Sequence, residues 1–192
     1  MNIGICGGTF DPFHRGHLDP ILAVRERMQW SRVIYVPAWK QPFKTDREHV
    51  SGYHRFAMAV LATEDYDDMF VSPMELERGA VSYTVDTLEV LRRMYPDATL
   101  DWIIGDDNLA DLGKWKNIER IFELARFVVL TRSGVKVSIP GRAIVFAPNA
   151  TVPVSSTEIR RRIRAGEPIE ELVHSRVAHY IQHNYLYREA QT

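Results

Sequence analysis

Residues 1–17, MNIGICGGTFDPFHRGH, constrain the fold of this chain more than any other stretch. Residues 3–6 form an apolar run that is too short for a helix and β-branched enough for a buried strand. Gly7, Gly8 and a polar turn follow, and from His17 apolar side chains recur at helical spacing. A strand, a glycine-rich turn and a helix in this order let the backbone approach a phosphate, because the helix N-terminus offers unpaired N–H groups. The stretch therefore predicts a nucleotide site.

Apolar runs and segments of helical periodicity alternate along the rest of the chain. We expect strands over residues 3–6, 32–37, 70–71, 100–105, 127–130 and 143–146, and helices over 17–29, 52–63, 85–94, 118–124, 154–164 and 175–183. Strands joined by helices indicate the α/β class: a doubly wound, mostly parallel, Rossmann-like sheet with a C-terminal helical segment. Ligands bind such sheets beyond the carboxyl ends of the strands, where the turns at 7–12 and 104–107 are expected to lie.

The composition disfavours several classes of protein. The 192 residues carry a net charge of −1, so no global field favours nucleic acid or an anionic membrane as a partner. The single cysteine, Cys6, excludes internal disulfides and fits a reducing compartment. No apolar run has the length of a membrane span and the N-terminus lacks signal-peptide features, so a cytoplasmic location is expected. Residues 1–192 are predicted to form a single domain, and its oligomeric state, a homo-oligomer included, stays open.

His14 and His17 lie one helical turn apart at the expected helix N-terminus, where an anion would be held. A glycine pair after a strand often reflects only tight packing, and a single histidine is more often a surface or core residue. The complete string GGTFDPFHRGH, however, resembles the T/HxGH signature of the nucleotidylyltransferase superfamily, and its opening looks most like the branch that makes dinucleotides. The resemblance implies the nucleotidylyltransferase fold and an ATP-binding turn made of Gly7, Gly8, Thr9, Phe10, His14 and His17.

A second candidate phosphate site is the string SSTEIR at residues 155–160. Three hydroxyls followed by an acidic residue and then by cations are typical of a helix start. The same N-terminus can bind phosphate, because Arg160 lies one turn in and faces the same way as Ser156 and Thr157. The string also matches the SSTxIR motif of the superfamily. The match implies contacts with the ATP phosphates and adenosine from Ser155, Ser156, Thr157 and Arg160.

A third group of residues indicates the second substrate. It consists of Gly79, the string SYTVDTL at 82–88, the string IGDD at 104–107, and Trp115. In order and spacing these residues resemble the bacterial nicotinate-nucleotide adenylyltransferases, and the resemblance covers effectively the full chain. Read without it, Trp115 would more often be a core or interface aromatic.

This third resemblance implies particular roles for residues at the base pocket. Trp115 is expected to stack on the pyridine ring of the mononucleotide. Thr84 and backbone N–H groups at Trp115 and Lys116 are expected to bind the carboxylate. Gly105 and Asp107 are expected near adenosine. The sequence departs from the family in the loop after the second strand, where QPFK at residues 41–44 stands in place of the common PPHK.

We therefore expect adenylyl transfer from ATP to nicotinate mononucleotide, giving deamido-NAD and pyrophosphate in NAD biosynthesis. The reaction needs placement and charge, because the attacking phosphate is already an anion and no protein nucleophile is required. The predicted catalytic residues are His14, His17, Lys44 and Arg160. Mg²⁺ is expected to bind mainly through the ATP phosphates, without a metal site of the protein's own.

Two alternatives to this expectation stay open. The acceptor could instead be nicotinamide mononucleotide or phosphopantetheine, and the chain could be a nucleotide-binding regulator that does not turn over. The SYTVDTL string and the GxD…W segment disfavour phosphopantetheine, because they resemble the nicotinate-nucleotide family. The intact pair of His14 and His17 disfavours a regulator.

Overall fold

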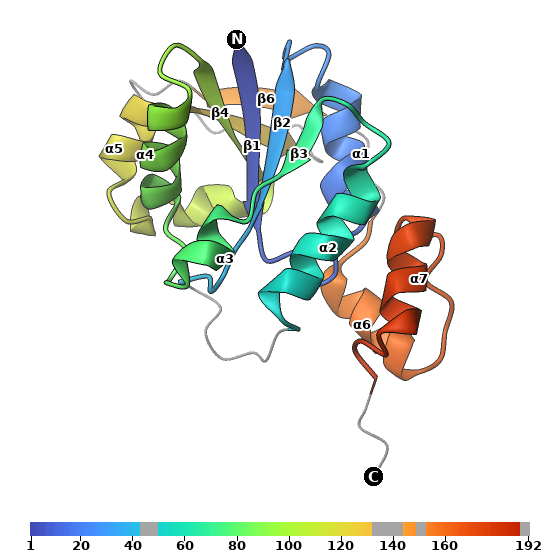
Figure 1. Ribbon diagram of the computed structural model, residues 1–192. Coiled ribbons are helices and arrows are strands. Elements are labelled where there is room, and N and C mark those ends of the chain that lie inside the picture. Colours follow the sequence, from blue (N-terminus) through green and yellow to red (C-terminus); the bar gives the residue numbers. More distant parts are fainter. Residues whose placement is uncertain (43–49, 132–143, 149–152, 189–192) are drawn as a thin grey trace.

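One six-stranded sheet forms the centre of the computed structural model, which describes residues 1–42, 50–131, 144–148 and 153–188 (Figure 1). Its strands are β1 (Asn2–Gly8), β2 (Arg32–Pro37), β3 (Met69–Val71), β4 (Thr99–Gly105), β5 (Arg126–Thr131) and β6 (Ile144–Pro148). Their order across the sheet is β3-β2-β1-β4-β5-β6, and every neighbouring pair is parallel. This order confirms the predicted α/β class and the doubly wound sheet.

Helices cover both faces of the sheet (Figure 1). One face packs against α1 (Arg15–Val24) and α2 (Gly52–Thr63), and α6 (Ser156–Arg164) and α7 (Ser175–His183) extend the same buried cluster beyond α2. The other packs against α4 (Thr84–Met94), the 3₁₀ helix η1 (Asp106–Lys114) and α5 (Ile118–Leu124). Within the described ranges, no helix is long and apolar enough to cross a membrane.

Strand β2 shows how the sequence produces this two-sided packing. Val33 and Tyr35 are buried against the α1 and α2 side, whereas Ile34 and Val36 are buried against the α4 side. Successive side chains of a strand point to opposite faces, so a strand covered on both faces must be apolar throughout. The apolar run at residues 33–37, preceded by Arg32, therefore indicates this strand, and the predicted bounds 32–37 match the observed ones.

The strand order reverses between β1 and β4, the two strands at the centre of the sheet. From β1 the chain winds toward β2 and β3, and from β4 it winds toward β5 and β6. In open α/β sheets the ligand crevice lies outside the carboxyl ends of the strands at such a reversal. Gly8 ends β1 and Gly105 ends β4, so both predicted turns lie at this edge.

The first helix is shorter than its apolar periodicity predicts. α1 starts at Arg15, slightly before the predicted range 17–29, and ends at Val24, well before the predicted end of that range. The N–H of Trp30 donates to the carbonyl of Arg25 at 3.1 Å, and its indole N–H donates to the buried carboxylate of Asp101 at 2.8 Å. This anchor across the sheet turns the chain toward β2 before the apolar spacing runs out.

The short helix α3 (Met74–Arg78) was not predicted from the sequence. It is only five residues long, which leaves too little apolar periodicity to detect. Its boundaries are nevertheless marked by Pro73 at the N-cap and by Gly79 at the C-cap, where φ is 62°. These two residues were the available signal.

Candidate active site

The turn after β1 packs tightly against two aromatic side chains. A Cβ atom on Gly7 would lie 2.8 Å from the ring of Trp102, and a Cβ atom on Gly8 would lie 2.7 Å from the ring of Phe10. Both positions therefore require glycine, because a side chain there would overlap a buried ring. Tight packing is thus confirmed as one reason for this glycine pair, and phosphate approach stays a prediction. Within the described residues, the buried Oγ1 of Thr9 has no hydrogen-bond partner.

The two histidines of the turn stack on one another at the start of α1. His14 is the N-cap residue, and its backbone N–H donates to Nδ1 of His17 at 3.2 Å. The ring centroids are 3.7 Å apart and the rings are inclined by 21°. A Cβ atom on Gly16 would lie 3.0 Å from the His14 ring, so the glycine between the histidines leaves room for the stack. The HRGH string is therefore explained in part by local geometry, and its chemical role stays a prediction.

The side chain of His17 is held in one orientation by its surroundings. Its Nδ1 accepts the hydrogen bond from His14, so the neutral ring carries its proton on Nε2. The rings of Phe10 and Phe13 lie against it, with centroids 4.9 and 5.3 Å away. Apolar walls strengthen a donor's interaction with charge, because they lower the local dielectric. His17 is thus a preorganised donor at the edge of the sheet.

Helix α6 contacts the turn directly and brings the two predicted phosphate motifs together. The hydroxyl of Ser156 donates to the carbonyl of Pro12 at 3.1 Å. Arg160 donates through Nη1 to the carbonyl of Asp11 at 2.5 Å and through Nη2 to Oγ1 of Thr157 at 3.2 Å. The juxtaposition of the motifs is a structural fact, and their contacts with phosphate stay predictions.

Ser155 performs the structural role that its position predicts. Its hydroxyl accepts a hydrogen bond from the N–H of Glu158 at 3.2 Å, as an N-cap residue does. The cap begins α6 at Ser156, so the helix presents its N-terminus and Arg160 to the turn. The capping interpretation of this string is therefore confirmed.

Arg55 is a buried cation beneath the turn that sequence reasoning missed. Its side chain is 2% exposed, and it donates to the carbonyls of Thr9 at 2.5 Å and Val50 at 3.2 Å. Burial lowers the pKa of Arg55, and the nearby groups of Asp11 and Tyr187 oppose this shift. The available signal was periodicity, since Arg55 shares the apolar stripe of α2 with three buried residues: Met58, Ala59 and Ala62.

Asp11 and Tyr187 form a second contact that the motifs did not reveal. Asp11 is 3% exposed, and its Oδ1 accepts a hydrogen bond from the Tyr187 hydroxyl at 2.7 Å. Nη1 of Arg160 lies 3.8 Å from the other carboxylate oxygen of Asp11. Burial raises the pKa of Tyr187, so its hydroxyl keeps its proton. The turn is therefore braced by α2, by α6 and by the end of the chain.

The predicted adenosine residues lie at the end of β4. Gly105 ends the strand, and a Cβ atom there would overlap Oδ1 of Asp107. The same Oδ1 accepts a hydrogen bond from Nδ2 of Asn108 at 3.0 Å. Asp107 is exposed, and its Oδ1 lies next to Gly105 at the end of β4.

Two of the predicted base-pocket residues, Thr84 and Lys116, lie at the N-terminus of α4. Thr84 is the first residue of that helix. Nζ of Lys116 lies 3.3 Å from both carboxylate oxygens of Asp86 and 4.4 Å from the ring centroid of Tyr83. Trp115 is half-buried and meets the ring of Phe127 edge to face, with centroids 5.9 Å apart. Lys116 therefore contacts the first turn of α4, the helix that Thr84 begins, whereas the ring contact of Trp115 is with β5.

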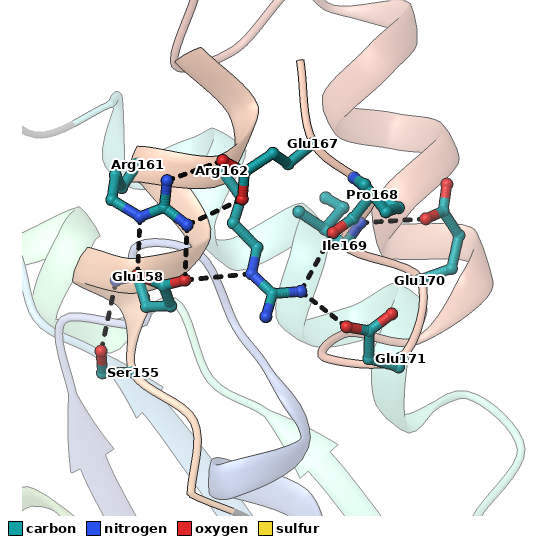
Figure 2. Close-up of polar contacts among 9 residues, drawn as sticks. All are labelled: Ser155, Glu158, Arg161, Arg162, Glu167, Pro168, Ile169, Glu170 and Glu171. Carbon is teal, nitrogen blue, oxygen red and sulfur yellow. Dashed lines mark hydrogen bonds and ion pairs between the residues drawn. The ribbon is translucent and has the colours of Figure 1, made fainter. Parts of the chain in front are cut away.

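The other arginines at the centre of α6 are engaged in ion pairs away from the turn (Figure 2). Arg161 pairs with Glu158 at 2.8 Å and with Glu167 at 2.7 Å. Arg162 pairs with Glu158 at 3.0 Å and with Glu171 at 2.6 Å. These cations hold the pKa of Glu158 at about 2. The network therefore ties α6 to the segment that follows it.

Two expectations concern groups that the structure does not test. Lys44 and its neighbour Phe43 lie outside the described residues. Among the residues that the structure describes, no group of three or more His, Cys, Asp or Glu side chains could hold a metal ion. The described chain thus offers no metal cage of its own, and an ion carried by substrate phosphates is compatible with this arrangement.

Sequence relatives match over nearly their whole length. Residues 5–162 match the family described as cytidylyltransferase-like. The "probable nicotinate-nucleotide adenylyltransferase" of Clavibacter michiganensis subsp. michiganensis (strain NCPPB 382) is 36% identical over 197 residues, covering 100% of this chain and 96% of the relative. The protein of the same name from Tropheryma whipplei (strain Twist) is 40% identical over 183 residues, covering 95% and 97%.

Solved structures with a similar fold include one enzyme in two complexes. Plasmodium falciparum nicotinic acid mononucleotide adenylyltransferase complexed with NaAD matches with a TM-score of 0.79 at 20% identity, and 97% of each chain is covered. The same enzyme complexed with APC gives a TM-score of 0.78 at 20% identity, with coverage of 97% of this chain and 96% of that one. At this identity the likeness shows a shared fold.

Proposed function

Because this chain belongs to the cytidylyltransferase-like family, and within it to the nicotinate-nucleotide adenylyltransferases, we propose that it transfers the adenylyl group of ATP to nicotinate mononucleotide. The products are deamido-NAD and pyrophosphate, and the reaction is a step of NAD biosynthesis. The observation that carries the proposal is the meeting of two phosphate motifs, where Ser156 and Arg160 donate to the carbonyls of Pro12 and Asp11. One ATP molecule can then contact both motifs.

The chemistry asks the protein for placement and for donors. A phosphate oxygen of the mononucleotide attacks the α-phosphorus of ATP, and the bond from that phosphorus to pyrophosphate breaks. Negative charge grows on the departing pyrophosphate, next to the N-terminus of α1 with His14 and His17. The His17 ring stacks on His14 and is held in one orientation by its neighbours. This supports the role, because a donor that is already oriented needs no rearrangement as the charge develops.

The remaining phosphate contacts are proposed for the turn after Gly7 and Gly8 and for α6. Thr9 Oγ1 is a buried hydroxyl without a hydrogen-bond partner in the described chain, and a phosphate oxygen would satisfy it. Among the described residues, Arg160 donates through Nη1 to Asp11 and through Nη2 to Thr157, and its remaining N–H groups are proposed to bind phosphate. Four further residues complete the proposed set: Ser155, Ser156, Thr157 and Lys44.

Mg²⁺ is proposed as the ion that accompanies ATP. Mg²⁺ commonly binds through substrate phosphates and water instead of a complete protein cage. This mode of binding is compatible with the described residues, which contain no group of three or more His, Cys, Asp or Glu side chains that could hold a metal ion. When bound, the ion neutralises charge on the triphosphate. The histidines and the α1 N-terminus orient and stabilise the same phosphates through hydrogen bonds.

The mononucleotide is proposed to bind at the N-terminus of α4. Trp115 offers an indole face for the pyridine ring, and Thr84 with the backbone of Trp115 and Lys116 offers donors for the carboxylate. Lys116 already neutralises Asp86 in the first turn of α4, which removes a charge that would repel that carboxylate. Phe10 borders the histidine pair, and Gly105 and Asp107 border the adenosine side of the crevice.

The proposed function is tested by pyrophosphate release from ATP with a panel of acceptors. The purified protein is supplied with nicotinate mononucleotide, nicotinamide mononucleotide or phosphopantetheine, and the dinucleotide product is identified by mass. We expect the highest kcat/KM with nicotinate mononucleotide. A higher kcat/KM with either other acceptor would overturn the substrate, and tight ATP binding without pyrophosphate release would indicate a regulator.

A further inference from the structure

Tyr187, near the end of the chain, reaches the ATP turn although it belongs to neither phosphate motif. Its hydroxyl donates to Oδ1 of Asp11 at 2.7 Å, across 176 positions of sequence. Nη1 of Arg160 lies 3.8 Å from Oδ2 of the same carboxylate. Two donors from different segments thus meet one buried acid, next to a residue of the proposed phosphate site.

The segment that carries Tyr187 is firmly placed. Leu186 is buried, and its N–H donates to the carbonyl of Ile181 in α7 at 3.0 Å. Tyr185 and Tyr187 adopt φ values of 53° and 65°, in the left-handed region that costs free energy for residues other than glycine. Such conformations persist where packing and hydrogen bonds over-determine them. The contact between Tyr187 and the turn is one of these determinants.

We propose that Tyr187 is a positioning residue for adenylyl transfer: its hydrogen bond orients the Asp11 carboxylate, which holds Arg160 and the turn that leads into His14. This inference rests on the proposed function. Arg160 also donates to the carbonyl of Asp11 at 2.5 Å, so the position of this one residue sets both the guanidinium and the turn. Tyr187 acts through Asp11 and not through contact with a substrate.

The decisive variant is Tyr187→Phe, which keeps the ring and removes the hydroxyl. We expect kcat to fall about 10- to 100-fold, since a hydrogen bond to a charged group is lost from a preorganised site. KM for nicotinate mononucleotide should stay within about twofold, because Thr84 and Trp115 bind at the N-terminus of α4. Tyr185→Phe is the matched control: Tyr185 is in the same segment, is 72% exposed and should keep wild-type kcat.

A double-mutant cycle separates positioning from general structural support. In an Asp11→Ala background the hydroxyl has lost its acceptor, so adding Tyr187→Phe should not lower kcat further. If Asp11→Ala does not fold, Asp11→Asn replaces it, and the effect of Tyr187→Phe should then shrink because the acceptor is uncharged. Wild-type kcat in Tyr187→Phe, or an equal loss in both backgrounds, would overturn the inference.

The same experiment keeps the two proposals apart. The ratio of variant to wild type is measured with whichever acceptor of the panel supports the fastest pyrophosphate release. A wild-type preference for another acceptor overturns the proposed substrate and leaves this ratio measurable. Thermal unfolding of each variant confirms that kcat is compared at a temperature where all are folded.

Discussion

The hydroxyl of Ser156 donates a hydrogen bond of 3.1 Å to the carbonyl of Pro12, and 144 positions of sequence separate the two residues. Ser156 is the first residue of α6, and Pro12 lies in the turn between β1 and α1. Two segments that each carry part of the proposed phosphate site are therefore joined directly. A substitution on α6 should therefore alter the turn, because this hydrogen bond joins them directly.

Ser156→Ala tests this joint. The variant leaves the carbonyl of Pro12 without its donor, which costs about 1–3 kcal/mol where water cannot replace it. We expect kcat/KM for ATP to fall about 10-fold, with KM for nicotinate mononucleotide unchanged. Steady-state kinetics with each substrate varied in turn measure both. Ser175→Ala is the matched control, because Ser175 is an exposed serine at the first position of α7. Equal kinetics for the two variants would contradict the prediction.

His14→Ala and His17→Ala should each lower kcat by about 10²- to 10³-fold, as the loss of one preorganised donor does in other enzymes. KM for ATP should change less, because the lost interaction is strongest in the transition state. His179→Ala, on the exposed side of α7, serves as the control and should keep wild-type kcat. Folded variants of both histidines with near-normal kcat would exclude this role.

Arg55→Met should destabilise the protein by about 2–4 kcal/mol, because the carbonyls of Thr9 and Val50 lose their donor and the buried Asp11 loses a nearby cation. Chemical denaturation measures the free energy of unfolding. Arg93→Met, an exposed arginine of α4, should change it by less than about 0.5 kcal/mol. A similar small change for both variants would show that Arg55 does not brace the turn.

The ion pairs of α6 predict a pH-dependent contribution to stability. Arg161 and Arg162 hold the pKa of Glu158 at about 2, below its ordinary value of 4.5. A carboxylate with a depressed pKa stabilises the fold fully above its unfolded pKa, and this stabilisation is lost as the pH falls toward the folded pKa. Glu158→Gln should therefore lower Tm above pH 5, and the difference from wild type should disappear between pH 4.5 and pH 2.

Two comparisons check this interpretation of Glu158. Salt should reduce the Tm difference at pH 7, because these side chains are exposed to solvent and screened by ions. Glu26→Gln, an exposed carboxylate outside these pairs, should show no comparable pH dependence. A Tm difference for Glu158→Gln that is constant from pH 7 to pH 2 would assign the effect to packing.

Much of the fold could be predicted because its signals are local. The run at residues 33–37 contains no charged residue, and the hydroxyls before residue 158 form a helix cap with neighbours in sequence. The end of α1 could not be predicted, because it depends on Trp30 reaching Asp101 across the sheet. Periodicity contains no information about that partner.

The candidate site likewise contains residues that local motifs indicate and partners that only the fold reveals. Short motifs predict that Ser156 and Arg160 contact phosphate, since a motif preserves residue type and spacing. The partners of these side chains, Pro12 and Asp11, are distant in sequence and follow only from the fold. Arg55 gave a usable signal as a cation on an apolar stripe, but its target, the carbonyl of Thr9, has no sequence signature.

The choice between nicotinate and nicotinamide mononucleotide is predicted by donor geometry at α4. An ionised carboxylate has only acceptors, so the Thr84 hydroxyl and nearby backbone N–H groups can satisfy both of its oxygens. A carboxamide directs an NH₂ group at one of these donors, which leaves that donor unpaired at about 1–3 kcal/mol. The charge-assisted part of the other hydrogen bonds is lost as well.

We therefore expect the wild-type enzyme to prefer the acid by about 10²-fold or more in kcat/KM, measured with both mononucleotides at saturating ATP. Trp115→Ala should weaken the binding of both mononucleotides by similar factors, because stacking on the indole does not depend on the carboxyl group. The same variant should leave KM for ATP nearly unchanged. Thr84→Val should instead reduce the preference itself, since it removes a donor to the carboxylate and keeps the side-chain volume. Comparable kcat/KM for acid and amide in the wild-type protein would refute the carboxylate pocket and, with it, nicotinate mononucleotide as the preferred acceptor.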